Sequence, residues 1–183
     1  MSRTAVLLRS CVIFLLLCST ARPADSARNQ GAQTGALPGP EFNVLDKWRG
    51  TWDVKATRRQ PPPAQESSYV ETFDWVLDHR YLRSETSRKS DGGMTMSMFW
   101  FDMVTKNYRL AIFDASGLAI ELPPPTWSER TQTMEWRSGL FTPTSYTGSA
   151  TFTDRDTIRW KSLLKDWKGT VILDLEGTSI RRK

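Results

Sequence analysis

Apolar and polar residues alternate with a period of two over most of the chain after residue 50. This alternation is typical of strands that bury one face and expose the other. Turn-forming segments such as Ser90–Gly93 separate the alternating stretches at intervals of about ten residues. We predict strands over 51–56, 69–76, 81–87, 94–101, 108–112, 118–122, 131–137, 145–152, 157–161 and 170–175, with 178–180 continuing the last one.

The number and spacing of these strands predict an all-β fold, either a sandwich or a barrel. No helical stretch separates them, which argues against a parallel α/β sheet. Closing a long antiparallel sheet removes its exposed edges. We therefore expect a single antiparallel up-and-down barrel of about ten strands. Apolar residues at helical spacing in Phe42–Trp48 predict a short helical lead-in that ends at Arg49–Gly50.

The first residues have the order of a secretory signal peptide. Arg3 and Arg9 precede and interrupt an apolar run that ends near Cys18, and small residues follow. The run is shorter than the roughly 20 residues of a membrane span, so no stable span is expected. We predict a signal peptide over 1–21, with cleavage after Ser26 as an alternative. A lipoprotein with Cys18 as the lipidated residue is a further alternative.

Export defines the rest of the organisation. Residues 22–41 are poor in large apolar side chains and are expected to form a flexible linker, which leaves 42–183 as the barrel domain. Cleavage removes both cysteines, so no disulfide is expected in the periplasm or outside the cell. It also removes two arginines and no acid, so the net charge falls from +5 to +3. This weak charge does not indicate nucleic-acid binding.

Three segments carry a resemblance to a known family. They are Leu45–Trp52 with its Gly-x-Trp sequence, the turn segment Val76–Leu82, and the late hairpin from Asp156 to Arg181. From about Phe42 to Arg182 the chain resembles a bacterial lipocalin-like family of the calycin superfamily, of unknown function. The resemblance implies a barrel and no particular activity. It also implies that a late basic residue, Arg181 or Arg182, covers the indole of Trp52 by a cation–π contact.

A lipocalin-like barrel suggests a cavity, and its lining can be proposed from strand parity. The candidates are aromatic, methionine and two charged residues that share a parity with their strand neighbours: Trp52, Glu71, Phe73, Arg83, Met94, Met96, Met98, Trp100, Tyr108 and Trp136. Methionine suits adaptable apolar pockets, although the row Met94–Met98 is also explained by ordinary core filling, which we favour.

Glu71 and Arg83 allow two interpretations. If both side chains point inward, they form a pair that recognises a polar ligand group. If both point outward, they form a cross-strand surface pair, and this is the favoured interpretation.

The sequence gives little support for a catalytic site or for a cofactor site. His79 is the only histidine and falls in a predicted turn, where capping or hydrogen bonding is its expected role. The haem-binding barrels that the chain resembles use a histidine on a late strand, and the chain has none there. The Gly-x-Ser-x-Gly nucleophile elbow is absent. We expect no catalytic residue, no metal site, no cofactor and no enzymatic activity.

The sequence therefore favours an exported lipocalin-like barrel that binds a small, largely apolar ligand in its cavity. The alternative is a filled barrel that acts as a structural or protein-interaction module of the cell envelope, through its loops. The sequence identifies neither the ligand nor a protein partner.

Overall fold

The computed structural model describes residues 38–138 and 144–183. The predicted signal peptide and nearly all of the predicted linker lie outside the described residues. The first described element is helix α1 (Pro40–Asp46), two residues earlier than the expected lead-in at Phe42. Proline suits the first turn of a helix because no intrahelical partner is needed for its missing N–H. The last two residues assigned to the linker are therefore helical.

The remaining elements are all strands. They are β1 (Gly50–Gln60), β2 (Gln65–Val76), β3 (Tyr81–Thr86), β4 (Thr95–Asp102), β5 (Asn107–Asp114), β6 (Ala119–Glu121), β7 (Thr126–Ser128), β8 (Thr133–Arg137), β9 (Thr144–Asp154), β10 (Thr157–Asp166) and β11 (Val171–Arg181).

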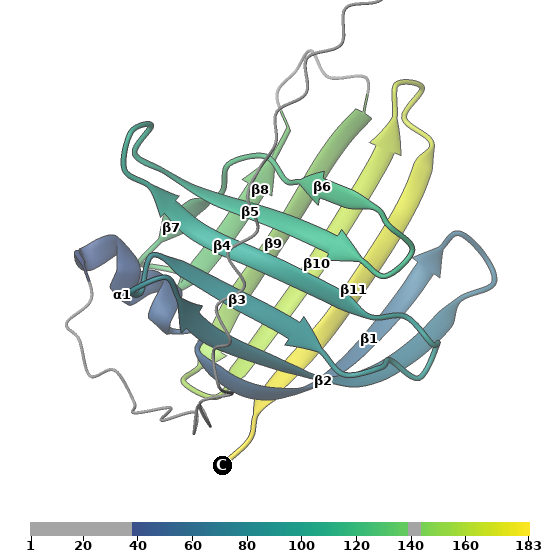
Figure 1. Ribbon diagram of the computed structural model, residues 1–183. Helices are drawn as coiled ribbons and strands as arrows, with labels where there is room; N and C mark the ends of the chain where they lie inside the picture. Colours follow the sequence, from purple (N-terminus) through teal and green to yellow (C-terminus); the bar gives the residue numbers. More distant parts are fainter. Residues whose placement is uncertain (1–37, 139–143) are drawn as a thin grey trace, which may run out of the picture. The chain divides into compact units, whose positions relative to one another are not determined.

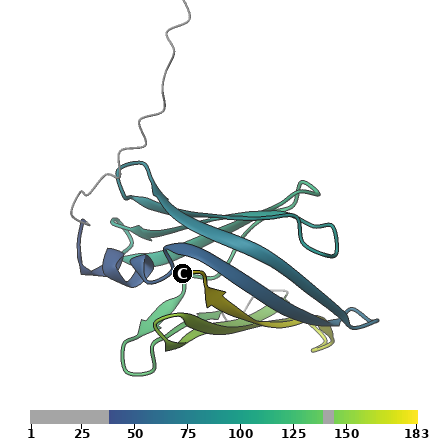
Figure 2. The same cartoon turned by 90° about the horizontal axis from the view of Figure 1, so that it is seen from below.

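These strands form one antiparallel sheet in the order β6-β5-β4-β3-β2-β1-β11-β10-β9-β8-β7. Neighbours in the sheet are neighbours in sequence, apart from the pairing of β1 with β11. The sheet curls into a half-barrel, with β2–β5 facing β8–β11 (Figures 1 and 2). The expected all-β, up-and-down lipocalin-like fold with a short N-terminal helix is confirmed. Its edge strands, β6 and β7, follow one another in the chain and are not hydrogen-bonded to each other.

One strand was not expected, and the expected continuation of the last strand past a glycine has a clear reason. β7 was not predicted, because three residues after Pro123–Pro125 give too short a pattern; it pairs with β8 through Trp127 and Met134. β11 runs through Gly177 without a break. A Cβ at Gly177 would overlap the Trp160 ring and lie 2.7 Å from the carbonyl oxygen of Lys55. The glycine is therefore required by close packing and does not end the strand.

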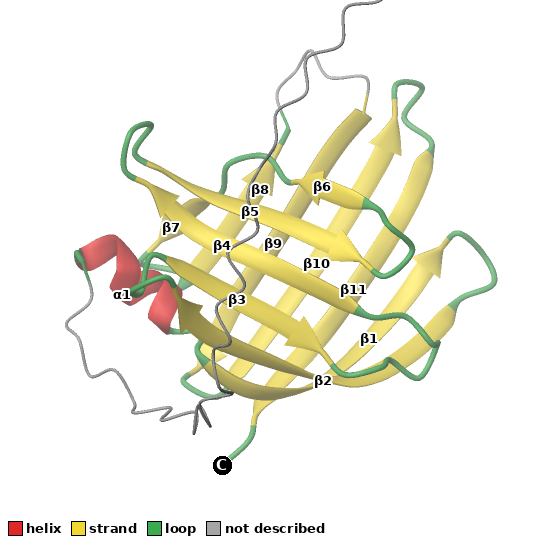
Figure 3. Ribbon diagram, viewed as in Figure 1, coloured by secondary structure: helices red, strands yellow, loops and turns green. Residues whose placement is uncertain are grey.

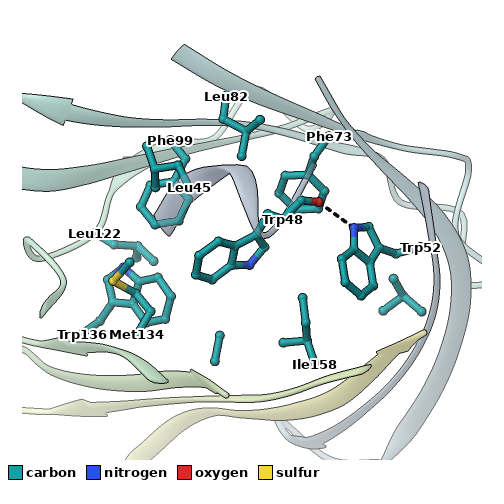
Figure 4. Close-up of a cluster of buried hydrophobic side chains, with 12 residues drawn as sticks. Leu45, Trp48, Trp52, Phe73, Leu82, Phe99, Leu122, Met134, Trp136 and Ile158 are labelled. Atoms are coloured by element: carbon teal, nitrogen blue, oxygen red, sulfur yellow. Dashed lines mark hydrogen bonds between the residues drawn. The ribbon is translucent and has the colours of Figure 1, made fainter. Parts of the chain in front are cut away.

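Helix α1 lies at one end of the barrel (Figure 3), and the buried residues Leu45 and Trp48 of this segment belong to the hydrophobic core. Trp48, just after the helix, is buried between the two walls (Figure 4). Its ring centroid lies 5.4 Å from that of Phe99 and 4.7 Å from that of Phe152. The carbonyl oxygen of Trp48 accepts a 2.7 Å hydrogen bond from Trp52 Nε1. These contacts fix the helix at the start of β1.

Polar contacts also hold the helix to the wall that contains β2–β5. Trp75 Nε1 on β2 donates a 2.8 Å hydrogen bond to Asp46 Oδ1, and Tyr108 Oη on β5 lies 3.3 Å from the carbonyl oxygen of Glu41. Phe42 and Leu45 are fully buried against the strands. These contacts hold α1 to the β2–β5 wall, and Trp48, just after the helix, packs against Phe152 of the other wall, so this segment closes the end of the barrel.

Candidate ligand-binding cavity

A cavity of about 310 Å³ lies between the two walls of the barrel. Most of its lining is apolar and aromatic, and the residues of this kind are Trp48, Trp52, Tyr69, Phe73, Phe99, Leu110, Ile112, Leu122, Trp136, Ala150, Ile158, Trp160 and Leu175. Its polar lining consists of Glu71, Ser84, Lys89, Thr95, Ser97, Tyr146, Ser149, Lys161, Ser162 and Ser179. A largely apolar interior with a few polar groups is typical of small-molecule sites.

Small side chains at inward positions create this space. Ser84 on β3 and Ser97 on β4 are directly opposite each other in the sheet. Across the barrel, Ala150 on β9 is opposite Trp160 on β10, and Trp160 is opposite Gly177 on β11. Leucine or phenylalanine at these positions would fill the interior, as they do near α1. The cavity therefore exists because the residues at these inward positions are small.

Glu71 is the only acidic residue in the lining. Its Oε1 accepts a 2.7 Å hydrogen bond from Ser84 Oγ, which lies 2.6 Å from Ser97 Oγ. Among the described residues Oε2 has no hydrogen-bond partner, and the accessible part of the side chain faces the cavity. Burial raises the pKa of the Glu71 carboxyl above its ordinary value, against the opposing effects of Ser84 and Lys89.

The opposite wall contributes further polar groups. Tyr146 Oη lies 2.9 Å from Ser162 Oγ, and Trp160 Nε1 donates to Ser179 Oγ at 3.2 Å. Burial raises the pKa of the Tyr146 hydroxyl, so it stays protonated at neutral pH. Trp136 Nε1 is buried and has no hydrogen-bond partner among the described residues. A buried N–H without a partner costs about 1–3 kcal/mol, so a ligand or water acceptor next to it would be stabilising.

The cavity reaches the end of the barrel opposite α1. Lys89, from the loop between β3 and β4, lines it there, with its ammonium 4.9 Å from the centroid of the Tyr69 ring. Burial and the nearby carboxylates of Glu71 and Asp91 raise the pKa of the Tyr69 hydroxyl. The mouth therefore presents a cation and a neutral phenol, whereas the carboxyl of Glu71 lies deeper.

Four of the ten residues proposed from the sequence line this cavity. Trp52, Glu71 and Phe73 lie on the inward faces of β1 and β2, and Trp136 lies on the inward face of β8. Tyr108 also points inward, but it packs between Phe99 and Phe101 near α1 and does not line the cavity.

The other five proposed residues require a correction. Met94 precedes β4 and is exposed. Met96, Met98 and Trp100 alternate along β4 and lie on the outward face of that strand. The inward residues of β4 are Thr95, Ser97, Phe99 and Phe101, of which Phe99 and Phe101 are buried. Both faces of this strand are apolar in sequence, so the choice between them depended on pairing with β3.

Arg83 is the fifth residue, and neither interpretation of the Glu71–Arg83 pair is correct. Arg83 points outward, where its Nε lies 3.5 Å from Glu85 Oε1. Glu71 points inward and has Ser84 as its partner. Adjacent residues of a strand face opposite sides, and Ser84 is the β3 residue opposite Phe73, on the inward face.

Sequence reasoning missed the serines and the late aromatic residues of the site. Ser84 and Ser97 carry no signal of their own, since serine is common on either face of a strand. Trp160 lines the cavity and was not among the residues proposed from the sequence. Its hydrogen-bond partner, Ser179, lies on a neighbouring strand, so only the register of β10 with β11 reveals the contact.

The described residues contain no group of three or more His, Cys, Asp or Glu side chains placed to hold a metal ion. His79 packs edge-on against Trp75, with 6.1 Å between ring centroids, outside the cavity lining. In the described part of the chain, no helix has the length and apolar character needed to cross a membrane.

Solved structures of other proteins share this architecture. Rv2717c from M. tuberculosis matches with a TM-score of 0.60 at 14% identity, over 81% of this chain and 100% of its own. The S-type phycobiliprotein lyase CPES from Guillardia theta matches with a TM-score of 0.51 at 12% identity, over 80% of this chain and 94% of its own. At these identities the likeness concerns the fold.

The comparison with curated proteins found no match. A family model does match residues 37–173, which is most of the chain, and its description is "Protein of unknown function (DUF1579)". The resemblance to a lipocalin-like family of unknown function is thereby confirmed, and the chain belongs to the DUF1579 family.

Proposed function

We propose that this protein is an exported, non-enzymatic barrel that binds a small, largely apolar molecule in its interior cavity. The observation that carries the proposal is the cavity of about 310 Å³, walled by aromatic residues and containing polar atoms without partners. Its volume is at the lower end of the range for small-molecule sites, which favours a compact ligand of one or two rings.

Burial of apolar ligand surface would supply most of the binding free energy, at about 25 cal/mol for each Å² removed from water. The half-buried rings of Tyr69 and Trp160 line the cavity and offer flat surfaces for this contact. Polar groups on the two walls would fix the orientation. The unpartnered indole N–H of Trp136 would donate to a ligand acceptor, and the second oxygen of Glu71, which has no partner among the described residues, would accept from a ligand donor.

Two measurements test the binding function. Native mass spectrometry of the protein from its own host detects a bound molecule as mass that is lost on denaturation. Titration with N-phenyl-1-naphthylamine, which becomes fluorescent in apolar surroundings, measures access to the cavity. Ala150→Leu places a larger side chain at a buried lining position, where it would occupy space that the dye needs. It should weaken dye binding at least about tenfold, which corresponds to about 1.4 kcal/mol of binding free energy.

Ala111→Leu is the matched control, because Ala111 lies on β5 between the inward residues Leu110 and Ile112 and so faces outward. It should leave dye binding unchanged. A bare native mass together with equal dye binding in both variants would refute the cavity as a ligand site. The filled-barrel alternative, in which the outer surface binds a protein, would then be preferred.

The export component is supported by the positively charged start, the apolar run and the small residues of 1–21. Its test is fractionation of the producing cells followed by mass measurement of the mature N-terminus. A mature chain that begins at Arg22 in the periplasm or medium is expected. An uncleaved chain in the cytoplasm would refute export without affecting the cavity.

A further inference from the structure

The described lining of the cavity contains one carboxyl group, that of Glu71, and the only described cation that acts on it is Lys89, through its charge and without an ion pair. Glu71 forms no ion pair with any described lysine, arginine or histidine. Its only hydrogen-bond donor is the hydroxyl of Ser84, which occupies Oε1. Glu71 is half-buried and lines the cavity, so a donor on a bound molecule can reach the oxygen that Ser84 leaves without a partner.

None of the described lysine and arginine side chains of this region forms an ion pair or a hydrogen bond with Glu71. Lys89, at the cavity mouth, lies over the Tyr69 ring instead of pairing with Glu71. Arg83, the nearest arginine on β3, pairs with Glu85 outside the barrel. Lys161, the other lysine of the lining, is exposed and alternates with the inward residues Trp160 and Ser162 on β10. The protein itself therefore leaves the free oxygen of Glu71 directed at the space that a ligand would fill.

We propose that the ligand is a small apolar amine, whose ammonium or N–H group binds Oε2 of Glu71. The assignment rests on the proposed function, because it names the chemical class of ligand for the same cavity. The apolar part of the amine lies between Phe73 and Phe99 on one wall and Trp160 on the other. Ser84 and Ser97 hold the carboxyl in place by a continuous chain of hydrogen bonds.

The same geometry selects against ligands of the opposite charge. A carboxylate placed at this depth would face the carboxyl of Glu71, and like charges at a buried site repel strongly. An acid would be favoured only if its head group stayed at the mouth beside Lys89. The sign of the preferred ligand charge therefore distinguishes recognition by Glu71 from recognition by Lys89.

Three probes of nearly the same shape test this assignment: 1-naphthylmethylamine, 1-naphthalenemethanol and 1-naphthoic acid. Their dissociation constants are measured at pH 7 by tryptophan fluorescence on the full chain, on Glu71→Gln and on Glu85→Gln. Glu85, exposed on the outer face of β3, provides the matched control. In the wild type we expect the amine to bind at least about tenfold more tightly than the alcohol, and the acid to bind most weakly.

In Glu71→Gln the amine should lose about tenfold in affinity, whereas the alcohol should keep its affinity, which also shows that the cavity is intact. Glu85→Gln should preserve the wild-type order. If no probe binds the wild type, the proposed function fails and the assignment fails with it. If the alcohol binds but the amine has no advantage, or keeps its advantage in Glu71→Gln, the cavity is a ligand site and the amine assignment is overturned. The order of affinities of the three probes for the wild type is measured without any variant. It therefore tests the amine assignment even if Glu71→Gln does not fold.

Discussion

The guanidinium of Arg181 lies over the indole of Trp52, 4.1 Å from the ring centroid. The same guanidinium donates hydrogen bonds to the carbonyl oxygens of Lys47 and Arg49, and its Nε lies 3.1 Å from Asp156 Oδ1. One residue of the last strand thus secures the start of the first strand and the segment after the helix. Of the two arginines expected to cover Trp52, Arg181 has this role, and Arg182 pairs with Asp53 outside the barrel.

Loss of this arginine should destabilise the whole fold. We expect Arg181→Ala to lower the free energy of unfolding by about 2–4 kcal/mol, because a cation–π contact and several hydrogen bonds to carbonyl groups are lost together. Urea denaturation followed by tryptophan fluorescence measures the change. Arg182→Ala, which removes an exposed ion pair, is the control and should have a clearly smaller effect. Equal losses in the two variants would contradict a special role for Arg181.

The buried carboxyl of Glu71 should make stability depend on pH in a defined direction. Its pKa is raised in the folded protein, so the native state holds this proton more tightly than the unfolded chain does. Stability is therefore lost as the pH rises from the ordinary value of 4.5 towards the folded-state pKa. Glu71→Gln lacks this titration, so it should gain stability relative to the wild type as the pH rises above 4.5.

Urea denaturation of both proteins at several pH values measures that difference. Glu85→Gln, whose side chain is outside the barrel, should follow the wild type. A constant difference between Glu71→Gln and the wild type across the range would show that Glu71 is not perturbed by burial.

Gly177 should be intolerant of even one added carbon. A Cβ at this position overlaps the Trp160 ring, so Gly177→Ala should cost about 1–3 kcal/mol through overpacking. Displacement of Trp160 towards the cavity should also weaken binding of N-phenyl-1-naphthylamine. Gly93→Ala, where the nearest atoms belong to the flexible side chains of Asp91 and Lys89, is the matched control. Unchanged stability in Gly177→Ala would mean that the strands can separate to make room.

Neighbouring residues of β4 should respond very differently to truncation. Phe99 is 3% exposed in the core, so Phe99→Ala should cost about 3–5 kcal/mol. Met98 lies on the outward face, so Met98→Ala should cost less than about 1 kcal/mol and leave dye binding unchanged. Thermal or urea denaturation distinguishes the two. A larger loss of stability in Met98→Ala than in Phe99→Ala would indicate that the methionines, and not the phenylalanines, face the barrel interior.

The amino-acid sequence by itself determined the secondary structure class and much of the order of elements. Period-two alternation between turn-forming segments is a local property, so it predicted most strands, and helical spacing predicted the short helix. The resemblance to a lipocalin-like family, carried in part by Gly-x-Trp at residues 50–52, implied the contact between Trp52 and a late arginine. Two cavity residues, Trp52 and Phe73, followed from parity as aromatic members of their strands. Glu71 shares the parity of Phe73, but the favoured interpretation placed it outside, because both faces of its strand carry apolar residues.

The tertiary structure decided which face of an ambiguous strand points inward. In β4, methionines and Trp100 alternate with Phe99 and Phe101. Both faces of the strand are therefore apolar, and alternation alone does not show which face points into the barrel. The pairing of Leu82 with Phe99 and of Ser84 with Ser97 places the phenylalanines inside. The position of Glu71 without a counter-ion was likewise visible only in three dimensions, because its surroundings come from strands far apart in the chain. Alternation defines two faces of a strand, and only packing against the other strands determines which of them is buried.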